Sequence, residues 1–291
     1  MEKTKKERIV SNETVEVVMG DFLQYWDLER MPFPKLTAPE NAYEDIRTNQ
    51  KVKRLQQVLA TGEMGVVVGE VGMGKSTFLD IFLSQISISK YRIIHLPIPQ
   101  SKPRELYRTI AEGMGVDTSL MGADSMKVSN WLMHSYLESN RPNLLLIDEA
   151  HILTPQALNE LRLITNASVK HQPIVTLILF GQPLLSSTLK SPALIPFVQR
   201  VGVWVSMEGL DIGQTGKYID WHLQNSGYKG EEIFPELTKK AIYRKTQGIP
   251  RMINRICLEC LHEAAINGTK VITESLFTQV CKNLAPHLSH G

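Results

Sequence analysis

Residues 64–83 read MGVVVGEVGMGKSTFLDIFL. An apolar run of strand length leads into a glycine-rich loop, and a helical pattern begins directly after the loop. Residues 69–76 (GEVGMGKS) fit G-x-x-x-x-G-K-[ST], the loop whose main-chain N–H groups surround phosphate groups. The glycines permit a close approach of the backbone, and the helix N-terminus adds a partial positive charge. The segment therefore predicts a nucleotide-phosphate site between a strand and a helix.

The residue types of this loop predict how ATP and Mg²⁺ are held. We expect Lys75 to reach the β- and γ-phosphates and the Ser76 hydroxyl to ligate Mg²⁺. A glycine-rich turn with a chance lysine is the alternative, but it would not need a strand before it and a helix after it. The positions predicted to contact the nucleotide are Gly69, Glu70, Val71, Gly72, Met73, Gly74, Lys75, Ser76 and Thr77.

A second segment, LLLIDEA (144–150), carries two acidic residues at the end of an apolar run. Ligands bind at the carboxyl ends of the strands in open α/β sheets. We expect Asp148 to hold Mg²⁺ and Glu149 to act as the general base that polarises the attacking water. Taken alone, the pair could also be the start of a helix; together with the glycine-rich loop it predicts ATP hydrolysis.

The order of the apolar runs predicts an α/β fold followed by a helical region. Runs of strand length alternate with helical patterns up to about residue 209, which indicates a parallel sheet covered by helices on both faces. Only helical patterns follow. We expect a flexible arm (1–24), a nucleotide-binding α/β domain (25–209), and a helical lid domain with a short tail (210–291). The segment YWDLERMPFP (25–34) is predicted to be an ordered strap laid against a domain.

Composition excludes several classes of protein. The formal net charge is only +2, so any contact with nucleic acid must come from a local basic surface. No stretch approaches the roughly 20 apolar residues of a membrane span, and the N-terminus does not resemble a signal peptide. Three cysteines without secretory features predict a cytoplasmic protein. Cys257 and Cys260 form a CxxC, which we interpret as one buried helix face rather than a metal or redox site.

Beyond these motifs, residues 25–285 resemble the AAA+ ATPases of the ExeA type, a group that includes accessory ATPases of DNA transposition. The resemblance covers most of the chain and is more specific than a nucleotide-binding loop alone. It is carried by YWDLERMPF (25–33), GEVGMGKST (69–77), PRELYRTIAEGMGV (103–116), LLLIDEAHILTPQALNELRLITN (144–166), TLILFGQPLL (176–185), FVQRV (197–201) and GIPRMINRIC (248–257).

The resemblance implies three further ATPase residues. Gln182 stands where these proteins place a polar sensor of the γ-phosphate, although Asn or Thr is commoner in AAA+ proteins generally. Arg200 is the candidate arginine finger acting on the ATP of a neighbouring subunit. Arg251 is the candidate lid arginine that senses the γ-phosphate.

The chain also departs from its relatives at two positions. Val198 and His222 stand where relatives often carry arginine, and both departures could weaken coupling to the nucleotide state. His151, directly after the DEA segment, is a candidate for orienting Glu149, although a hydrogen bond in the following turn is an equal alternative.

The resemblance also implies an output for the ATP. Secretion-linked relatives carry a transmembrane helix and a periplasmic module, which are not seen in these 291 residues. The expected function is therefore that of TnsC- and MuB-like regulators, which assemble on double-stranded DNA as a ring or helical filament. These regulators recruit or activate a transposase in DNA recombination. A targeting protein is a further expected partner, and no membrane contact is expected.

Basic residues in two loops are the candidate DNA contacts. Lys102 and Arg104, with Arg108 one helical turn further on, follow the second apolar run. Lys170 and His171 lie in the turn before the fourth. We expect phosphate contacts with little sequence preference. Solvated surface cations are the alternative for each residue. Three other functions stay open: a nucleotide-dependent scaffold that binds a protein without DNA, a helicase loader, and a secretion-linked ATPase of the ExeA type.

Overall fold

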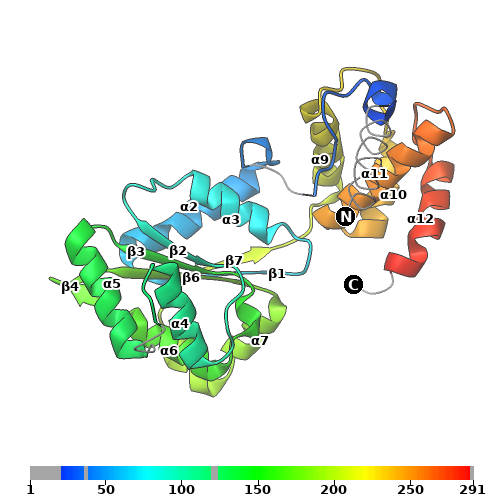
Figure 1. The fold of residues 1–291 in the computed structure, drawn as a ribbon. Coiled ribbons are helices and arrows are strands. Elements are labelled where there is room, and N and C mark those ends of the chain that lie inside the picture. Colours follow the sequence, from blue (N-terminus) through cyan, green and yellow to red (C-terminus); the bar gives the residue numbers. More distant parts are fainter. Residues whose placement is uncertain (1–20, 36–38, 119–123, 289–291) are drawn as a thin grey trace, which may run out of the picture. The chain divides into compact units, whose positions relative to one another are not determined.

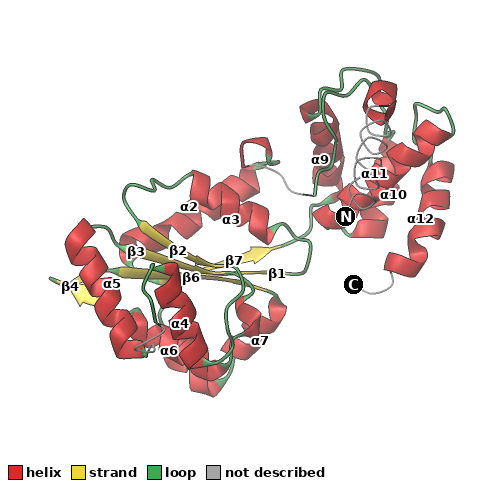
Figure 2. Ribbon diagram, in the orientation of Figure 1, coloured by secondary structure: helices red, strands yellow, loops and turns green. Residues whose placement is uncertain are grey.

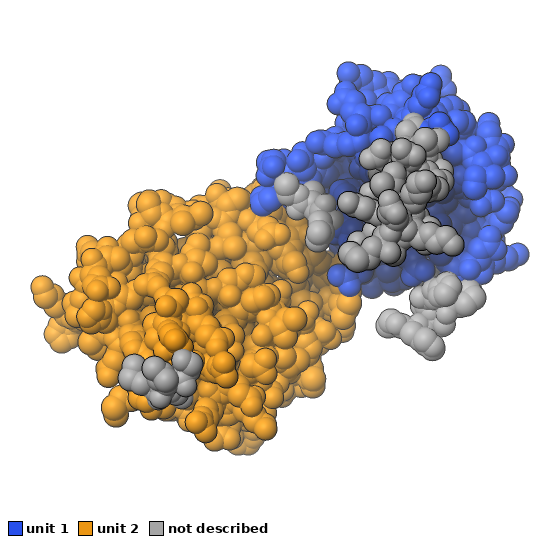
Figure 3. Space-filling model, in the orientation of Figure 1, with its two compact units in different colours: residues 1–43, 209–291 blue, residues 44–208 orange. Residues whose placement is uncertain are grey.

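The computed structural model describes residues 21–35, 39–118 and 124–288 (Figures 1 and 2). Contacts divide them into two compact units, coloured separately in Figure 3. One unit spans residues 44–208, and the other combines the described residues up to 43 with those from 209 onward. The first carries the sheet and the second is helical.

The sheet has five parallel strands in the order β2-β3-β6-β1-β7. This confirms the predicted fold class, because each apolar run of the sequence supplies one strand. The two central strands β3 and β6 are buried along their whole length, as expected when helices cover both faces. The strands are β1 (Met64–Gly69), β2 (Arg92–Leu96), β3 (Asn143–Ile147), β6 (Val175–Gly181) and β7 (Val201–Met207).

Helices cover the sheet on both faces. Helices α2 (Ile46–Thr61) and α3 (Lys75–Ser84) lie on one face, and four others lie on the opposite face (Figure 1). The second group comprises α4 (Pro103–Gly113), α5 (Ser125–Ser139), α6 (Pro155–Ile164) and α7 (Pro183–Leu189). A short helix, α8 (Ile195–Val198), and a hairpin, β4 (Ser168–Val169) with β5 (Gln172–Pro173), complete the unit.

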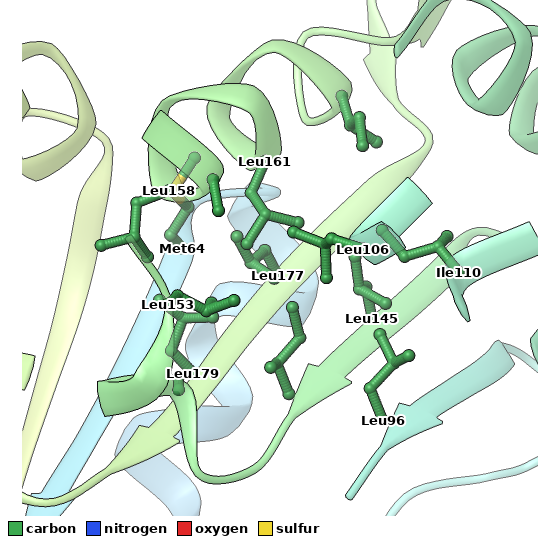
Figure 4. Close-up of a cluster of buried hydrophobic side chains, with 14 of the residues drawn as sticks. Met64, Leu96, Leu106, Ile110, Leu145, Leu153, Leu158, Leu161, Leu177 and Leu179 are labelled. Carbon is green, nitrogen blue, oxygen red and sulfur yellow. The ribbon is translucent and has the colours of Figure 1, made fainter. Parts of the chain in front are cut away.

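The main core lies between the sheet and the second group of helices (Figure 4). Leu145 and Leu177 on the central strands pack with Leu106 of α4 and Leu161 of α6, all fully buried. Burying one such side chain contributes roughly 1.5–3 kcal/mol. This core fixes the positions of the strand ends, where the predicted site residues lie.

The helical unit consists of four predicted segments that all form helices. They are α9 (Ile212–Asn225), α10 (Glu236–Thr246), α11 (Pro250–Ile266) and α12 (Glu274–Leu288). Cys257 and Cys260 are both fully buried in its core, which confirms the interpretation of the CxxC as one helix face. Burial raises the pKa of both thiols, so they are protonated near neutral pH.

The division of the chain differs from the predicted one at its N-terminal side. Of the predicted arm, residues 1–20 lie outside the described residues, whereas residues 21–26 are helical. Phe22, Trp26 and Phe33 pack in the core of the helical unit, not in the α/β unit. The Trp26 Nε1–H donates a hydrogen bond to the Leu261 carbonyl at 3.2 Å. These aromatic side chains cover apolar surface that four short helices leave open, which is why the segment groups with residues 209 onward.

His222 lies inside this unit among aromatic rings. Its ring is 4.4 Å from that of Tyr218, 4.9 Å from that of Trp221 and 5.0 Å from that of Phe33. Only 4% of the residue is exposed, and burial lowers the pKa of His222 to about 4. The imidazole is therefore neutral and packs among the aromatic rings.

His222 predicts acid sensitivity of the helical unit. In an unfolded chain the histidine pKa is about 6.5, so below that pH the unfolded state binds a proton that the folded state rejects. Stability is therefore lost as pH falls from about 6.5 towards 4, by roughly 2 kcal/mol at pH 5. In thermal unfolding at pH 7.5 and pH 5, His222→Phe should lose less Tm than wild type, while His134→Phe on the surface should behave as wild type. An equal loss in all three proteins contradicts the prediction.

Over the described part of the chain, no helix combines the length and apolar character needed to cross a membrane.

Candidate nucleotide-binding site

Apart from Arg200, the predicted nucleotide-site residues of the α/β unit follow three neighbouring strands. The glycine-rich loop follows β1, Asp148 and Glu149 follow β3, and Gln182 follows β6, which lies between them. Because the strands are parallel, their carboxyl ends meet at one edge of the sheet. The sequence separates these residues by more than a hundred positions, and the sheet order brings them together.

Glycine conformations shape the loop after β1. Gly72 and Gly74 have φ angles of 84° and 81°, in the left-handed region that side chains disfavour. A Cβ at Gly69 would lie 2.6 Å from the Met207 Cβ of β7, so only glycine fits against that strand. A Cβ at Gly74 would meet nothing within 4 Å, so this position is open and glycine is needed for its backbone conformation alone.

Lys75 begins α3 and points back into the loop. Its Nζ donates hydrogen bonds to the carbonyl oxygens of Gly69 at 2.8 Å and Glu70 at 3.1 Å, and only 9% of the residue is exposed. Ser76 is exposed beside it, and Thr77 is half-buried. Gly74, the N-cap residue of α3, makes no side-chain cap hydrogen bond, so the first N–H groups of the helix are available to an anion. The loop therefore fits a phosphate group on the side where Lys75 and Ser76 lie.

Asp148 lies one residue beyond β3, and its main-chain N–H donates to the Leu96 carbonyl at 2.9 Å. Burial raises the pKa of its carboxyl group, while the hydrogen bond from the Glu149 N–H at 2.8 Å and the positive charge of Lys75 oppose this. A partly buried carboxylate beside an ammonium group is a suitable ligand for a hard cation.

Glu149 has a left-handed backbone conformation, with φ 49° and ψ 32°. This conformation is uncommon for a residue with a side chain, and such residues gather at functional sites. The Oε2 atom lies 3.2 Å from Nδ1 of His151, close enough for an ion pair. Neither atom has a well-oriented hydrogen bond to a described residue. The structure thus places His151 beside Glu149, while its role in orienting the carboxylate stays a prediction.

Gln182 is half-buried at the first position after β6, and its side chain does not cap α7. Gly181 before it pairs with Val68 of β1, so Gln182 starts beside the phosphate-binding loop. A residue at this position faces the same edge of the sheet as Lys75 and Asp148. The placement agrees with the expected sensor, and the sensing itself stays a prediction.

Sequence analysis did not single out His95. It lies on β2, in register with Leu146 of β3. Burial raises the pKa of both Asp148 and Asp80, and the charge of His95 opposes this rise. Asp80 is on α3, one turn beyond the phosphate-binding loop. The position of His95 near these carboxylates could not be predicted from the sequence. A lone histidine in an apolar run acquires its neighbours only when the strands pair.

The ligands present suit Mg²⁺ held partly by the nucleotide. Among the described residues no group of three or more His, Cys, Asp or Glu side chains is placed to hold a metal ion. Mg²⁺ commonly takes one or two protein ligands and completes its shell with phosphate oxygens and water. Ser76 and Asp148 would supply such a pair, so the residues fit a nucleotide-bound Mg²⁺.

Arg200 lies at the other end of the strands. Its carbonyl accepts a hydrogen bond from Met64 N–H at the start of β1, at 2.9 Å, and β7 begins at the next residue. The five steps along β1 to Gly69 span about 17 Å at roughly 3.3 Å per residue. The exposed guanidinium donates a hydrogen bond to Asn166 Oδ1. Arg200 is therefore remote from the phosphate-binding loop of its own subunit.

Arg251 lies in the other unit, exposed in the first turn of α11. Pro250 occupies the first position of that helix, and Gly248 before it has φ 72°. Helix α10 thus ends and α11 begins just before Arg251. The contact of Arg251 with nucleotide stays a prediction.

The candidate DNA-binding residues are exposed, but they lie in two groups at opposite ends of the strands. Lys102 caps α4 after β2, with Arg104 in its first turn, whereas Lys170 and His171 form the tip of the β4–β5 hairpin that precedes β6. The first pair lies at the carboxyl ends of the strands and the second at their amino ends. Lys102 and Arg104 have no ion-pair partner among the described residues. Arg108 is paired with Glu112 at 2.8 Å.

Comparisons with known proteins agree with this site. The family model described as "AAA domain" matches residues 56–189, which include the phosphate-binding loop, Asp148, Glu149 and Gln182. The chain is 28% identical over 256 residues to general secretion pathway protein A of Aeromonas hydrophila. That match covers 86% of this chain but 46% of the relative, so the chain spans about half the length of that protein.

Solved structures share the fold at low sequence identity. ORC2 of Aeropyrum pernix, solved in ADPNP–ADP complexes, gives a TM-score of 0.61 at 14% identity, with 89% of this chain and 71% of that chain covered. Cdc6p of Pyrobaculum aerophilum gives 0.60 at 14%, with coverage of 86% and 70%. ORC1 of Aeropyrum pernix in complex with DNA gives 0.57 at 14%, with coverage of 87% and 67%. The AAA domain match, the order of the strands and the phosphate-binding loop together make this protein a nucleotide-binding ATPase with the AAA+ fold.

Proposed function

We propose that this ATPase hydrolyses Mg²⁺–ATP at a site shared between two subunits and that assembly on double-stranded DNA controls its activity. The observation that carries the shared site is the position of Arg200, about 17 Å along the strands from Gly69. A guanidinium so placed cannot serve the ATP of its own subunit. It can serve that of a neighbour, as arginine fingers supplied in trans do in other phosphoryl-transfer enzymes.

The residues at the carboxyl edge of the sheet divide the chemistry among them. Lys75 and the loop N–H groups bind the phosphates and offset their negative charge. Ser76 and Asp148 hold Mg²⁺, which when bound neutralises charge on the transferred phosphoryl group. Glu149 accepts the proton of the attacking water, and Gln182 contacts the γ-phosphate.

For the output, we propose phosphate contacts from Lys102 and Arg104. Both side chains are exposed, and neither has an ion-pair partner among the described residues, so both charges are available to an external anion. Each subunit supplies few contacts, so useful affinity requires many subunits along the duplex. Lys170 at the hairpin tip is a weaker candidate, because it lies at the opposite ends of the strands. Recruitment of a transposase and a targeting protein by this assembly rests on the resemblance to TnsC- and MuB-like regulators.

The second candidate function is that of a secretion-linked ATPase. It is favoured by the 28% identity to general secretion pathway protein A. Such a protein would use the same ATPase chemistry to drive a protein partner, and DNA would not affect it. The two candidates therefore differ in the response of binding and turnover to DNA.

DNA binding has a direct test. With a non-hydrolysable ATP analogue, wild type should shift double-stranded DNA of any sequence at low salt. The double variant Lys102→Ala/Arg104→Ala should bind all sequences more weakly and flatten the salt dependence by about two counterions, because two phosphate contacts are lost.

The matched control for this experiment removes two other exposed cations. Lys53 and Arg54 lie on α2, on the other face of the sheet (Figure 1), so Lys53→Ala/Arg54→Ala changes the net charge equally. This control should bind DNA as wild type does. Equal weakening in both double variants would contradict the assignment to Lys102 and Arg104. The absence of any DNA-bound species at low salt with nucleotide would leave the secretion-linked function.

A further inference from the structure

A side-chain contact joins two exposed residues on the far side of the α/β unit from the phosphate-binding loop. Arg200 lies between α8 and β7, and Asn166 lies between α6 and the β4–β5 hairpin. An Nη1–H of Arg200 donates to Oδ1 of Asn166. No other hydrogen bond of the Arg200 guanidinium to a described residue is present, so Asn166 is the neighbour that restricts this side chain.

The backbones at both ends of this contact are held by the core. Arg200 N–H donates to the Phe197 carbonyl at 3.0 Å, and Asn166 N–H donates to the Leu163 carbonyl at 3.1 Å. Phe197 and Ile164, close by in the chain, are fully buried. The Cα positions of the pair are therefore fixed by packing. Packing does not fix the long side chain of Arg200, because an exposed arginine samples many rotamers unless a contact selects one.

The chemistry of the acceptor suits an arginine that must act on an anion. An amide oxygen is neutral, so it occupies one of the five N–H donors and leaves the positive charge uncompensated. The remaining donors still form a planar fork that can bind two phosphate oxygens. An aspartate at the same position would hold the guanidinium as well, but it would pair with the charge and oppose its transfer to phosphate.

We propose that Asn166 is a positioning residue, which orients the Arg200 guanidinium towards the nucleotide of a neighbouring subunit while leaving its charge free. This inference rests on the proposed function in one respect, the action of Arg200 in trans. The Asn166 contact would hold the guanidinium in its working orientation before the reaction begins. Loss of this contact should therefore lower kcat and leave ATP affinity unchanged.

The test compares Asn166 variants in two backgrounds. Asn166→Ala should lower kcat of the assembled protein about tenfold, the scale of one lost hydrogen bond to a charged group, without changing KM. Asn166→Asp should also lower kcat, although it keeps an acceptor, because its carboxylate neutralises Arg200. In an Arg200→Ala background, neither Asn166 variant should lower the residual turnover further, since the side chain that Asn166 orients is gone.

A neighbouring asparagine supplies the matched control. Asn159 is half-buried on α6, and its Nδ2 donates to the Ala193 carbonyl at 3.1 Å, with no hydrogen bond to Arg200. Asn159→Ala should therefore turn over ATP at the wild-type rate. The proposal would be wrong if Asn159→Ala and Asn166→Ala lowered turnover equally, or if Asn166→Ala lowered turnover further in the Arg200→Ala background. Either result would mean that the Asn166 substitution lowers turnover by disturbing the fold.

The outcomes also separate this inference from the function on which it rests. An impaired Arg200→Ala with wild-type turnover in both Asn166 variants would leave the shared site intact and remove only the positioning role. Wild-type turnover in Arg200→Ala would overturn both.

Discussion

Glu149→Gln is expected to lower ATP turnover by about 10²-fold or more while ATP still binds. The amide keeps the size of the side chain but cannot accept the proton of the attacking water. Residues that hold the phosphates and Mg²⁺, such as Lys75 and Asp148, are unchanged. Steady-state phosphate release together with the affinity of a fluorescent ATP analogue would separate the two effects.

Two variants sharpen this experiment. Lys75→Ala should lose ATP binding as well as turnover, because it removes the ammonium that lies against the Gly69 and Glu70 carbonyls inside the loop. His151→Phe tests the neighbour at 3.2 Å from Glu149 and should give a smaller loss than Glu149→Gln if His151 only orients the carboxylate. Wild-type hydrolysis by Glu149→Gln would show that another group is the general base.

Arg200→Ala is expected to lower the turnover of assembled protein by about 10³-fold, the scale of an arginine finger in related phosphoryl-transfer enzymes. Specific activity of wild type should rise with protein concentration, because the complete site needs two subunits. ATP affinity of a dilute monomer should be unaffected, since Arg200 is remote from the loop of its own subunit.

Mixing two inactive proteins gives the decisive measurement for this site. A Glu149→Gln subunit keeps its Arg200, and an Arg200→Ala subunit keeps its Glu149. Where the first places its arginine against the nucleotide of the second, one intact site forms, so the mixture should exceed the activity of either protein alone. A lack of recovery together with full turnover by dilute monomers would exclude a shared site.

The phosphate-binding loop illustrates how far sequence reasoning reached. Gly72 and Gly74 have the left-handed backbone that glycine adopts readily, and Lys75 begins the predicted helix, because the rules that govern these features are local. The contact of Lys75 with phosphate stays a prediction. Main-chain strain and helix start depend on residues a few positions apart. The same holds for the inner strands β3 and β6, whose continuous apolar runs are the direct consequence of burial on both faces.

Contacts between distant segments could not be predicted in this way. His95 lies beside Asp148 through the pairing of β2 with β3, and Asn166 contacts Arg200 only because α6 ends and β7 begins at the same side of the unit. The aromatic residues of the 25–34 segment were expected to form a strap. The structure groups that segment with the helical unit, because Trp26 and Phe33 complete its core.

The sequence by itself determined the α/β class, the nucleotide-binding loop, the acidic pair at 148–149 and the helical region after residue 209. Each of these features can be predicted from the spacing of residues that are close in the sequence, because short-range sterics and the burial of apolar faces decide the local structure. Only the tertiary structure decided that Arg200 is remote from the loop of its own subunit, that Asn166 holds it, and that His222 is buried and neutral. These features depend on which strands pair and which helices pack together. That arrangement depends on how all the side chains of the core pack, so it cannot be predicted from one segment alone.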